Sequence, residues 1–187
     1  HGFPHSHMDG LPHFAHKGYF YNGVPYAAAI PTGTKKLGIH NAGIKGVFTR
    51  GVLVDMPAHL GFDYLDPGTA ITADDITDWE KKNRVRIGSG DVLLIRTGRW
   101  EKVRQDGQWN FLEKAAGLHA SVASFLRERD VAVIGCDGVS DVMPSGVEGR
   151  VNPLHELVLV GLGMPILDNL DLDPLAEVAA AQKRTTF

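Results

Sequence analysis

Residues 90–98 read GDVLLIRTG, and the apolar run inside them is the clearest structural signal in the chain. The turn-forming sequence GSG at 88–90 introduces it, and the aliphatic residues that follow are typical of a buried strand over 91–96. A second run, GVLVD at 51–55, is also rich in β-branched residues and predicts a buried strand that ends near Asp55. We therefore expect a domain built around a sheet of buried strands.

The segments around these strands alternate between helical and extended patterns. Residues 72–82 have the pattern of a helix, with Thr72 as N-cap and Asp74 and Asp75 in the first turn, where the helix dipole favours acids. Further helices are predicted at 119–129, 153–160 and 174–183, and further strands at 131–136 and 164–167. Residues 1–45 predict strand ends and long loops, and residues 98–117 a polar excursion. Strands that alternate with helices predict an α/β fold.

The composition is that of one packed domain. Of 187 residues, 43% are apolar and 22% are charged, so we expect a single domain over residues 1–187. The net charge of −3 and the dispersed Lys and Arg residues provide no basic surface for nucleic acid or anionic lipid, which favours a small-molecule partner. No apolar run is long enough for a membrane span, no signal segment opens the chain, and Cys136 alone cannot form an internal disulfide. These features favour a cytoplasmic protein.

Histidines are concentrated at the start of the chain, in HGFPHSHMDGLPH at 1–13. In an extended segment alternate side chains share a face, so His5, His7 and Asp9 would converge on one ion. Imidazole and carboxylate ligands suit Zn²⁺, Mn²⁺ or Fe²⁺, and an incomplete protein shell would leave a water on the metal. A tag remnant or a solvated loop is the alternative. Because this chemistry begins at His1, without an initiator Met, we expect that an N-terminal portion is missing.

The same stretch resembles the signature of the cyclase family, which includes bacterial kynurenine formamidases and isatin hydrolases. The signature is H-x-G-T-H-x-D-x-P-x-H, and SHMD at 6–9 followed by His13 is similar to its second half. The resemblance implies that His7 and Asp9 are metal ligands and that His13 is the catalytic base. The first His of the signature falls on Phe3 and its Pro on Leu11, so His5 or His1 would replace the first ligand.

A rival placement is offered by DMPAH at 55–59, which also has the form D-x-P-x-H. Thr49 and Leu53 then stand where the signature has histidines. The order of later blocks favours the first placement, because the family's blocks resemble, in the same order, GVLVD at 51–55, ITADDI at 71–76 and GDVLLIRTG at 90–98. We therefore expect His59 on a loop near the site, with a role as ligand as the alternative.

Two later blocks are expected to complete the site. CDGVSD at 136–141 follows a predicted strand and resembles the family's D-x-x-S-x-D block, so Asp137 and Asp141 are expected to orient neighbouring groups by hydrogen bonds. A turn stabilised by these side chains is the alternative. The family also pairs a His with a Glu, and this chain has His155 and Asp168 in those places. The resemblance implies Asp168 as a ligand and His155 as a ligand or substrate-polarising donor, with a structural role for His155 as the alternative.

Three residues are candidates for substrate binding. Arg96 ends a predicted strand and could clamp a carboxylate or carbonyl group, with a structural salt bridge as the alternative. Phe3 and Phe14 could form an aromatic wall for a planar substrate, with a place in the core as the alternative.

The resemblance runs from His5 to about Leu172. It implies one α/β domain with a mixed, partly closed β-sheet flanked by helices, assembled as a homodimer or homotetramer. It also implies a hydrolase of non-peptide C–N bonds that opens a small cyclic or aryl amide, or a lactone, with water activated by Mn or Zn. Two alternatives stay open: a catalytically altered binding homologue, and a metal-independent lactonase or lyase that uses His13 and His155.

Overall fold

A central five-stranded sheet organises the chain in the computed structural model, which describes residues 5–29 and 33–187. Its strands follow the order β1-β7-β6-β4-β2, and their bounds are β1 (His7–Asp9), β2 (Gly51–Asp55), β4 (Val92–Arg96), β6 (Val133–Cys136) and β7 (Ile166–Asp168). All neighbours pair in parallel except β1, which runs antiparallel to β7, so the sheet is mixed, as predicted. It is open rather than partly closed, because three strands separate its end strands β1 and β2.

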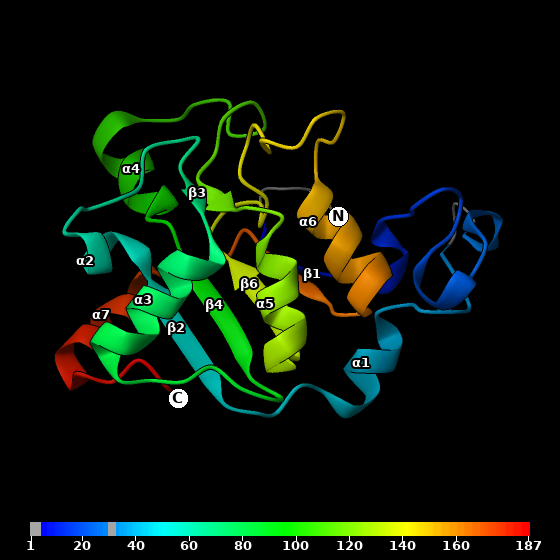
Figure 1. Ribbon diagram of the computed structural model, residues 1–187, viewed down its shortest axis with the longest axis horizontal. Helices are drawn as coiled ribbons and strands as arrows, with labels where there is room; N and C mark the ends of the chain where they lie inside the picture. Colours follow the sequence, from blue (N-terminus) through cyan, green and yellow to red (C-terminus); the bar gives the residue numbers. More distant parts are fainter. Residues whose placement is uncertain (1–4, 30–32) are drawn as a thin grey trace.

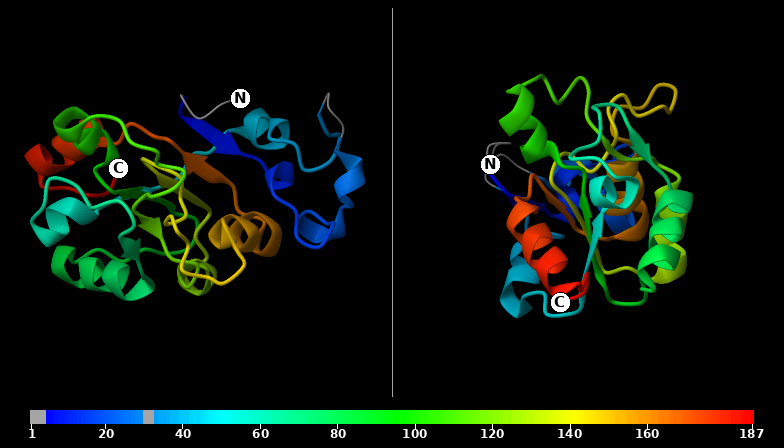
Figure 2. Two further views of the ribbon diagram at one scale, coloured as in Figure 1. Left: turned by 90° about the horizontal axis from the view of Figure 1, so that it is seen from above. Right: turned by 90° about the vertical axis from the view of Figure 1, so that its left-hand side faces the viewer.

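Helices cover both faces of this sheet, which confirms the α/β class. Figure 2 shows α3 and α5 on one face and α7 on the other. The helices are α1 (His40–Lys45), α2 (Met56–Leu60), α3 (Ala73–Asn83), α4 (Arg99–Asp106), α5 (Val122–Arg129), α6 (Pro153–His155), which continues as the π-helix η4 (Glu156–Leu162), and α7 (Asp173–Gln182). Short 3-10 turns lie at η1 (Leu11–His13), η2 (Tyr21–Gly23) and η3 (Tyr26–Ala28). A separate parallel pair joins β3 (Ala70–Ile71) to β5 (Gly117–Leu118).

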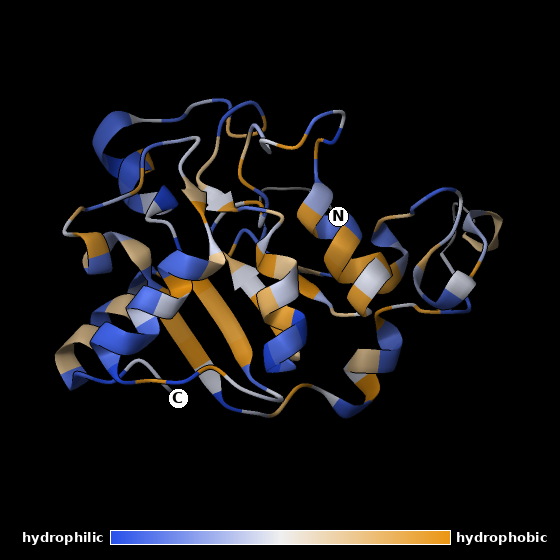
Figure 3. Cartoon of the chain, viewed as in Figure 1, coloured by the Kyte–Doolittle hydropathy of each residue, from blue (hydrophilic) through white to orange (hydrophobic). Residues whose placement is uncertain are grey.

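The apolar runs of the sequence become strands buried on both faces. Val52 and Val54 of β2 lie in the larger core cluster, with residues of α3 and α5. Leu53 of the same strand and Leu94 of β4 lie in a second cluster, against α7. Successive side chains of a strand point to opposite faces, so a strand covered by helices on both sides needs apolar residues at every position. Figure 3 shows these strands as the apolar centre of the molecule.

The C-terminal residues protect the edge of the sheet at β2. Backbone hydrogen bonds link Gly51 to Phe187 in both directions, and the Leu53 N–H donates to the carbonyl of Thr185. A Cβ atom at Gly51 would lie 2.3 Å from the Phe187 ring, so a larger residue there would displace that side chain. A paired edge does not offer free backbone groups to other strands. At the other end of the molecule, residues 10–29 and 33–45 extend away from the sheet (Figure 1).

No helix among the described residues combines the length and the apolar character that a membrane crossing demands. The largest fully buried side chains, for example Trp79, Leu53 and Ile95, belong to the core around the sheet.

Candidate metal centre

The pairing of β1 with β7 brings together residues that lie far apart in the sequence. His7 stands opposite Asp168, and Asp9 stands opposite Ile166. In Figure 2, the dark blue β1 lies along the orange β7. Side chains from both strands then meet beside α6, where Asp9 and Asp168 are only 3% and 1% exposed. Carboxylates are rarely buried to this extent unless charged partners or a metal compensate them.

Three of these side chains form a group with the dimensions of a metal site. His7, Asp9 and Asp168 each offer one ligand atom, and these atoms lie within 4.8 Å of one another. The Nδ1 atom of His7 lies 2.8 Å from the carbonyl oxygen of His5. Because a carbonyl only accepts, Nδ1 carries the proton and Nε2 presents its lone pair, as a metal-bound imidazole requires. The residues present therefore fit a divalent ion.

Asp9 lies at the centre of three imidazoles. Its Oδ1 is 3.8 Å from Nε2 of His7 and 3.7 Å from Nε2 of His13, and its Oδ2 is 3.6 Å from Nε2 of His155. These separations exceed those of direct hydrogen bonds. Of the three histidines, only His7 belongs with Asp9 to the group of possible ligands.

His155 is held among three carboxylates at the end of α6. Its Nδ1 lies 2.5 Å from Oδ2 of Asp141, and its Nε2 lies 3.2 Å from Oδ2 of Asp168. Burial by itself lowers the pKa of His155, but the carboxylates of Asp141, Asp168 and Asp9 outweigh it and raise the pKa well above its usual value. In the protein without metal, these three carboxylates therefore favour the charged form of His155.

His13 is the accessible imidazole beside this group. Its side chain is 37% exposed, and its ring lies 5.3 Å from that of Phe14, which is itself 5.0 Å from the ring of His155. Burial lowers the pKa of His13; Asp9 opposes this shift, and the positive charge of His155 adds to it. His13 is therefore neutral at pH 7 and can accept a proton.

The loop after β6 holds the buried acids in place. Ser140 donates from its hydroxyl (2.6 Å) and from its backbone N–H (3.1 Å) to Oδ1 of Asp168. Asp141 accepts from the backbone N–H groups of Leu154 and His155, so it also fixes the start of α6. Asp137 accepts from Thr97, through both backbone and hydroxyl, and therefore ties β6 to the end of β4. Both predicted orienting residues thus make hydrogen bonds, but only Asp141 contacts the imidazole.

The structure does not bring every predicted residue to this group. His5 is exposed and contributes a backbone carbonyl to His7, so its assignment as a ligand needs correction. Arg96 is engaged with Asp55 at 3.0 Å and Asp173 at 2.8 Å, which corrects its assignment to substrate binding and favours the salt-bridge alternative. Phe3 and His1 lie outside the described residues.

His59, the alternative ligand of the second motif, also lies apart from the group: its Nε2 pairs with Asp78 at 3.3 Å. Conversely, sequence reasoning gave no role to Ser140 or to Arg99. The serine of the D-x-x-S-x-D block was a usable signal for Ser140. Arg99 donates to the side chain of Asn169, next to Asp168, and nothing in its sequence context indicates this contact.

Comparisons with known proteins agree with this arrangement. Residues 5–141 match the family model described as "Putative cyclase". No protein of the curated set matches the chain. A crystal structure of a novel cyclase superposes with a TM-score of 0.84 at 28% identity, over 97% of this chain and 60% of that one.

Two more distant structures share the fold. Isatin hydrolase A from Ralstonia solanacearum is 20% identical, with a TM-score of 0.61 over 90% of this chain and 60% of that protein. A potential metal-dependent hydrolase with cyclase activity is 16% identical, with a TM-score of 0.55 over 91% of this chain and 64% of that protein. This chain thus spans less than two thirds of the length of each. The family match covers most of its residues, and the chain belongs to the cyclase family.

Proposed function

We propose that this chain carries the metal centre of a hydrolase that opens a small cyclic or aryl amide, or a lactone. The observation that supports this most is the convergence of His7, Asp9 and Asp168 within 4.8 Å, with His13 beside them. The solved relatives include an isatin hydrolase and a potential metal-dependent hydrolase, so the proposed reaction is of a kind named for proteins of this fold.

His7, Asp9 and Asp168 would hold the ion, which we propose to be Mn²⁺ or Zn²⁺. When bound, a divalent ion supplies Lewis-acid chemistry: it acidifies water and offsets negative charge on a carbonyl oxygen. The two buried carboxylates provide the anionic oxygen ligands that such an ion favours, and His7 provides a neutral nitrogen.

His13 moves the proton in this mechanism. Its neutral Nε2 takes a proton from the attacking water as the new C–O bond forms. The same proton then passes to the leaving nitrogen or oxygen as the C–N or C–O bond breaks, which leaves an amine or alcohol and a carboxylic acid. At neutral pH the acid releases its remaining proton to solvent and becomes a carboxylate. Phe14, whose ring packs against both imidazoles, would support one face of a planar substrate.

Asp141 determines the orientation of His155 because it accepts the Nδ1 proton and leaves Nε2 directed towards Asp9 and Asp168. Two roles are compatible with this position. His155 is either a further ligand or a donor to the substrate carbonyl.

A binding protein without catalysis is the second candidate. It is favoured by one observation: protonated His155 pairs with the buried acids and offsets part of their charge without any ion. The two candidates differ in their response to metal, since only the hydrolase needs the ion for activity.

The test is an assay of protein purified without a metal-affinity column and then loaded with Mn²⁺ or Zn²⁺. An N-formyl aryl amine, an isatin-like cyclic amide and an aryl lactone are the substrates, and the carboxylate product is quantified by chromatography. We expect metal-dependent release of the carboxylate from at least one substrate. Metal-loaded protein that hydrolyses none of them contradicts the hydrolase and favours the binding protein.

A further inference from the structure

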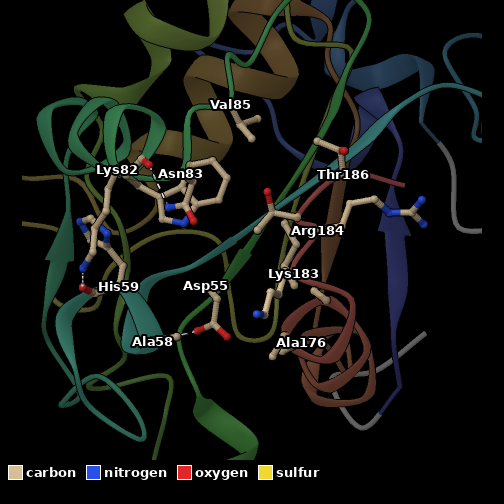
Figure 4. Close-up of a pocket in the computed structure, with 15 residues that line it drawn as sticks. Asp55, Ala58, His59, Lys82, Asn83, Val85, Ala176, Lys183, Arg184 and Thr186 are labelled. Atoms are coloured by element: carbon tan, nitrogen blue, oxygen red, sulfur yellow. Dashed lines mark hydrogen bonds between the residues drawn. The ribbon is translucent and has the colours of Figure 1, made fainter.

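A cavity separate from the metal centre lies at the β2 edge of the sheet, the edge opposite β1, between α2, α3, α7 and the C-terminal residues (Figure 4). We call it the α3–α7 groove. Its volume is about 450 Å³, which is within the range of small-molecule sites. None of His7, Asp9, His13, His155 and Asp168 lines it. The groove therefore has no part in the reaction proposed above.

About half of the residues that line the groove are apolar. They are Leu53, Ala58, Trp79, Val85, Ala176, Ala179 and Ala180. Trp79 belongs to the core cluster and is 2% exposed, so it forms part of the floor of the groove. The small alanine side chains of α7 leave the space open opposite it. A hydrocarbon ring of a ligand would find apolar contacts on both sides.

Cationic side chains surround this apolar surface. Figure 4 shows Lys82 projecting from α3 and Lys183 from the end of α7, with Arg184 next to it. The ammonium group of Lys82 donates to the carbonyl oxygen of His59 at 2.7 Å. Among the described residues, the side chains of Lys183 and Arg184 make no recorded hydrogen bond or ion pair. The ammonium group of Lys183 is therefore available to a ligand in the groove, whereas Figure 4 shows the guanidinium of Arg184 directed away from the other lining residues.

The acid that lines the groove does not cancel these charges. Asp55 accepts from Arg96 at 3.0 Å and from the backbone N–H of Ala58 at 3.2 Å, so its charge is balanced within the protein. His59, from the motif that the metal centre does not use, contributes its buried ring to the wall. The groove therefore combines an apolar interior with an excess of positive charge.

We propose that the α3–α7 groove binds a small amphipathic organic anion, an aryl carboxylate. The ring lies against Trp79 and the alanines of α7, and the carboxylate meets the ammonium of Lys183 at the mouth. Charge-assisted hydrogen bonds of this kind are stronger than neutral ones, and they orient a ligand whose ring provides the apolar contact area. This binding does not depend on hydrolysis.

The test follows the indole N–H signal of Trp79 by NMR while benzoate is titrated into the protein. Trp100 and Trp109 are internal references, because their indole N–H groups donate to the carbonyls of Leu170 and Lys114 outside the groove. Benzamide retains the ring without the charge, and acetate retains the charge without the ring. We expect a saturable shift of the Trp79 signal with benzoate that is much weaker with either analogue. Binding at the metal centre would leave that signal in place.

Two variants separate charge from shape. Lys183→Met should weaken benzoate binding by roughly threefold to tenfold, since it removes one exposed charge. Ala176→Leu should weaken it by filling the interior, and Lys81→Met, which removes an exposed charge of α3 outside the groove, should leave it unchanged. The proposal is overturned by a wild-type Trp79 signal that does not respond to benzoate, by equal binding of benzamide, or by unchanged binding in both Lys183→Met and Ala176→Leu.

Discussion

At the scale of single residues, the neighbouring imidazoles of His13 and His155 have pKa values that are shifted in opposite directions by their surroundings. His155 is 3% exposed and is surrounded by Asp9, Asp141 and Asp168, which favour its charged form. His13 is more exposed than His155, and its pKa is lowered mainly by the partial desolvation of its ring. The geometry therefore supports a fixed, charged group next to a neutral group that can exchange protons with bound substrate.

Replacement of His13 should separate catalysis from metal binding. In His13→Ala we expect hydrolysis to fall on the order of 10²- to 10⁴-fold, because general-base catalysis is lost while the proposed ligands remain. Steady-state rates and metal content are measured on the same sample, with His119→Ala as the control for loss of an imidazole elsewhere. Loss of the metal in His13→Ala would instead make His13 a ligand, and an unchanged rate would refute its role as base.

The ion pairs of Asp173 with Arg96 and Arg104 should make the stability of the fold depend on pH in the acid range. Burial alone raises the pKa of Asp173, but hydrogen bonds from Arg104 and Arg96 outweigh burial and lower it. The folded pKa is thus below the unfolded one, so this contribution to stability is present above the unfolded pKa and is lost as the pH falls through the folded one. Asp173→Asn should lower the free energy of unfolding at pH 7 by about 1 to 2 kcal/mol.

This loss should begin to shrink below about pH 4, where Asp173 of the unfolded wild-type chain takes up a proton, and should disappear as the pH falls through the lower pKa of the folded state. Urea unfolding at pH 7 and pH 3 measures both effects, and Asp171→Asn, an exposed acid on the same loop, is the control. An equal difference between wild type and Asp173→Asn at the two pH values would show that the ion pairs are not the cause.

Much of the candidate site could be predicted from single residues and their spacing. His7, Asp9 and Asp168 lie together with His13 beside them, at the places that the resemblance implies. Arg96 could not be placed in this way. Its partner Asp55 depends on the register of β2 with β4, which pairs these two residues directly and is a property of the folded sheet. His5 presents a related difficulty, because β1 begins only at His7 and the alternation of a strand does not extend to it.

At the scale of elements, the strands and helices that could be predicted from the sequence are those with a buried apolar face. The strand expected at 91–96 is β4, and the helix expected at 72–82 is α3. Helix α4, over Arg99–Asp106, was missed within the polar segment 98–117. Only Arg99 of that helix is buried, so it has no apolar stripe to reveal its period. Ion pairs and the contact of Trp100 with Leu170 anchor it instead.

The N-terminus of α3 provides a test of local stability. Thr72 and Asp75 form a capping box, in which each side chain accepts from the backbone N–H of the other. Thr72→Ala should lower the free energy of unfolding by about 1 kcal/mol, because the backbone N–H of Asp75 in the first turn loses its hydrogen bond to the Thr72 hydroxyl. Thr77→Ala in the same helix is the matched control and should have little effect, since Thr77 donates only to the preceding turn at Ala73. Equal destabilisation by the two changes would argue against the cap.

At the scale of the whole molecule, the segment before β2 carries apolar side chains that this chain does not cover. Tyr26 is 63% exposed, Ile44 78%, and Phe48 is fully exposed. We predict that the protein is a homodimer or homotetramer, because a second copy could bury such residues. Light scattering at micromolar concentration should give a multiple of the 20.3 kDa chain mass, and a monomer would contradict the prediction.

The metal content of the protein tests the central claim most directly. Wild type, Asp9→Asn and the control Asp171→Asn are purified without a metal-affinity column, incubated with Mn²⁺ or Zn²⁺, freed of unbound metal and analysed by mass spectrometry of the elements. Circular dichroism confirms that each variant is folded. The account predicts about one ion per chain in wild type and in Asp171→Asn, and almost none in Asp9→Asn, whose amide has lost the anionic oxygen at the centre of the site. Folded wild type without metal, or Asp9→Asn with as much metal as wild type, would contradict it.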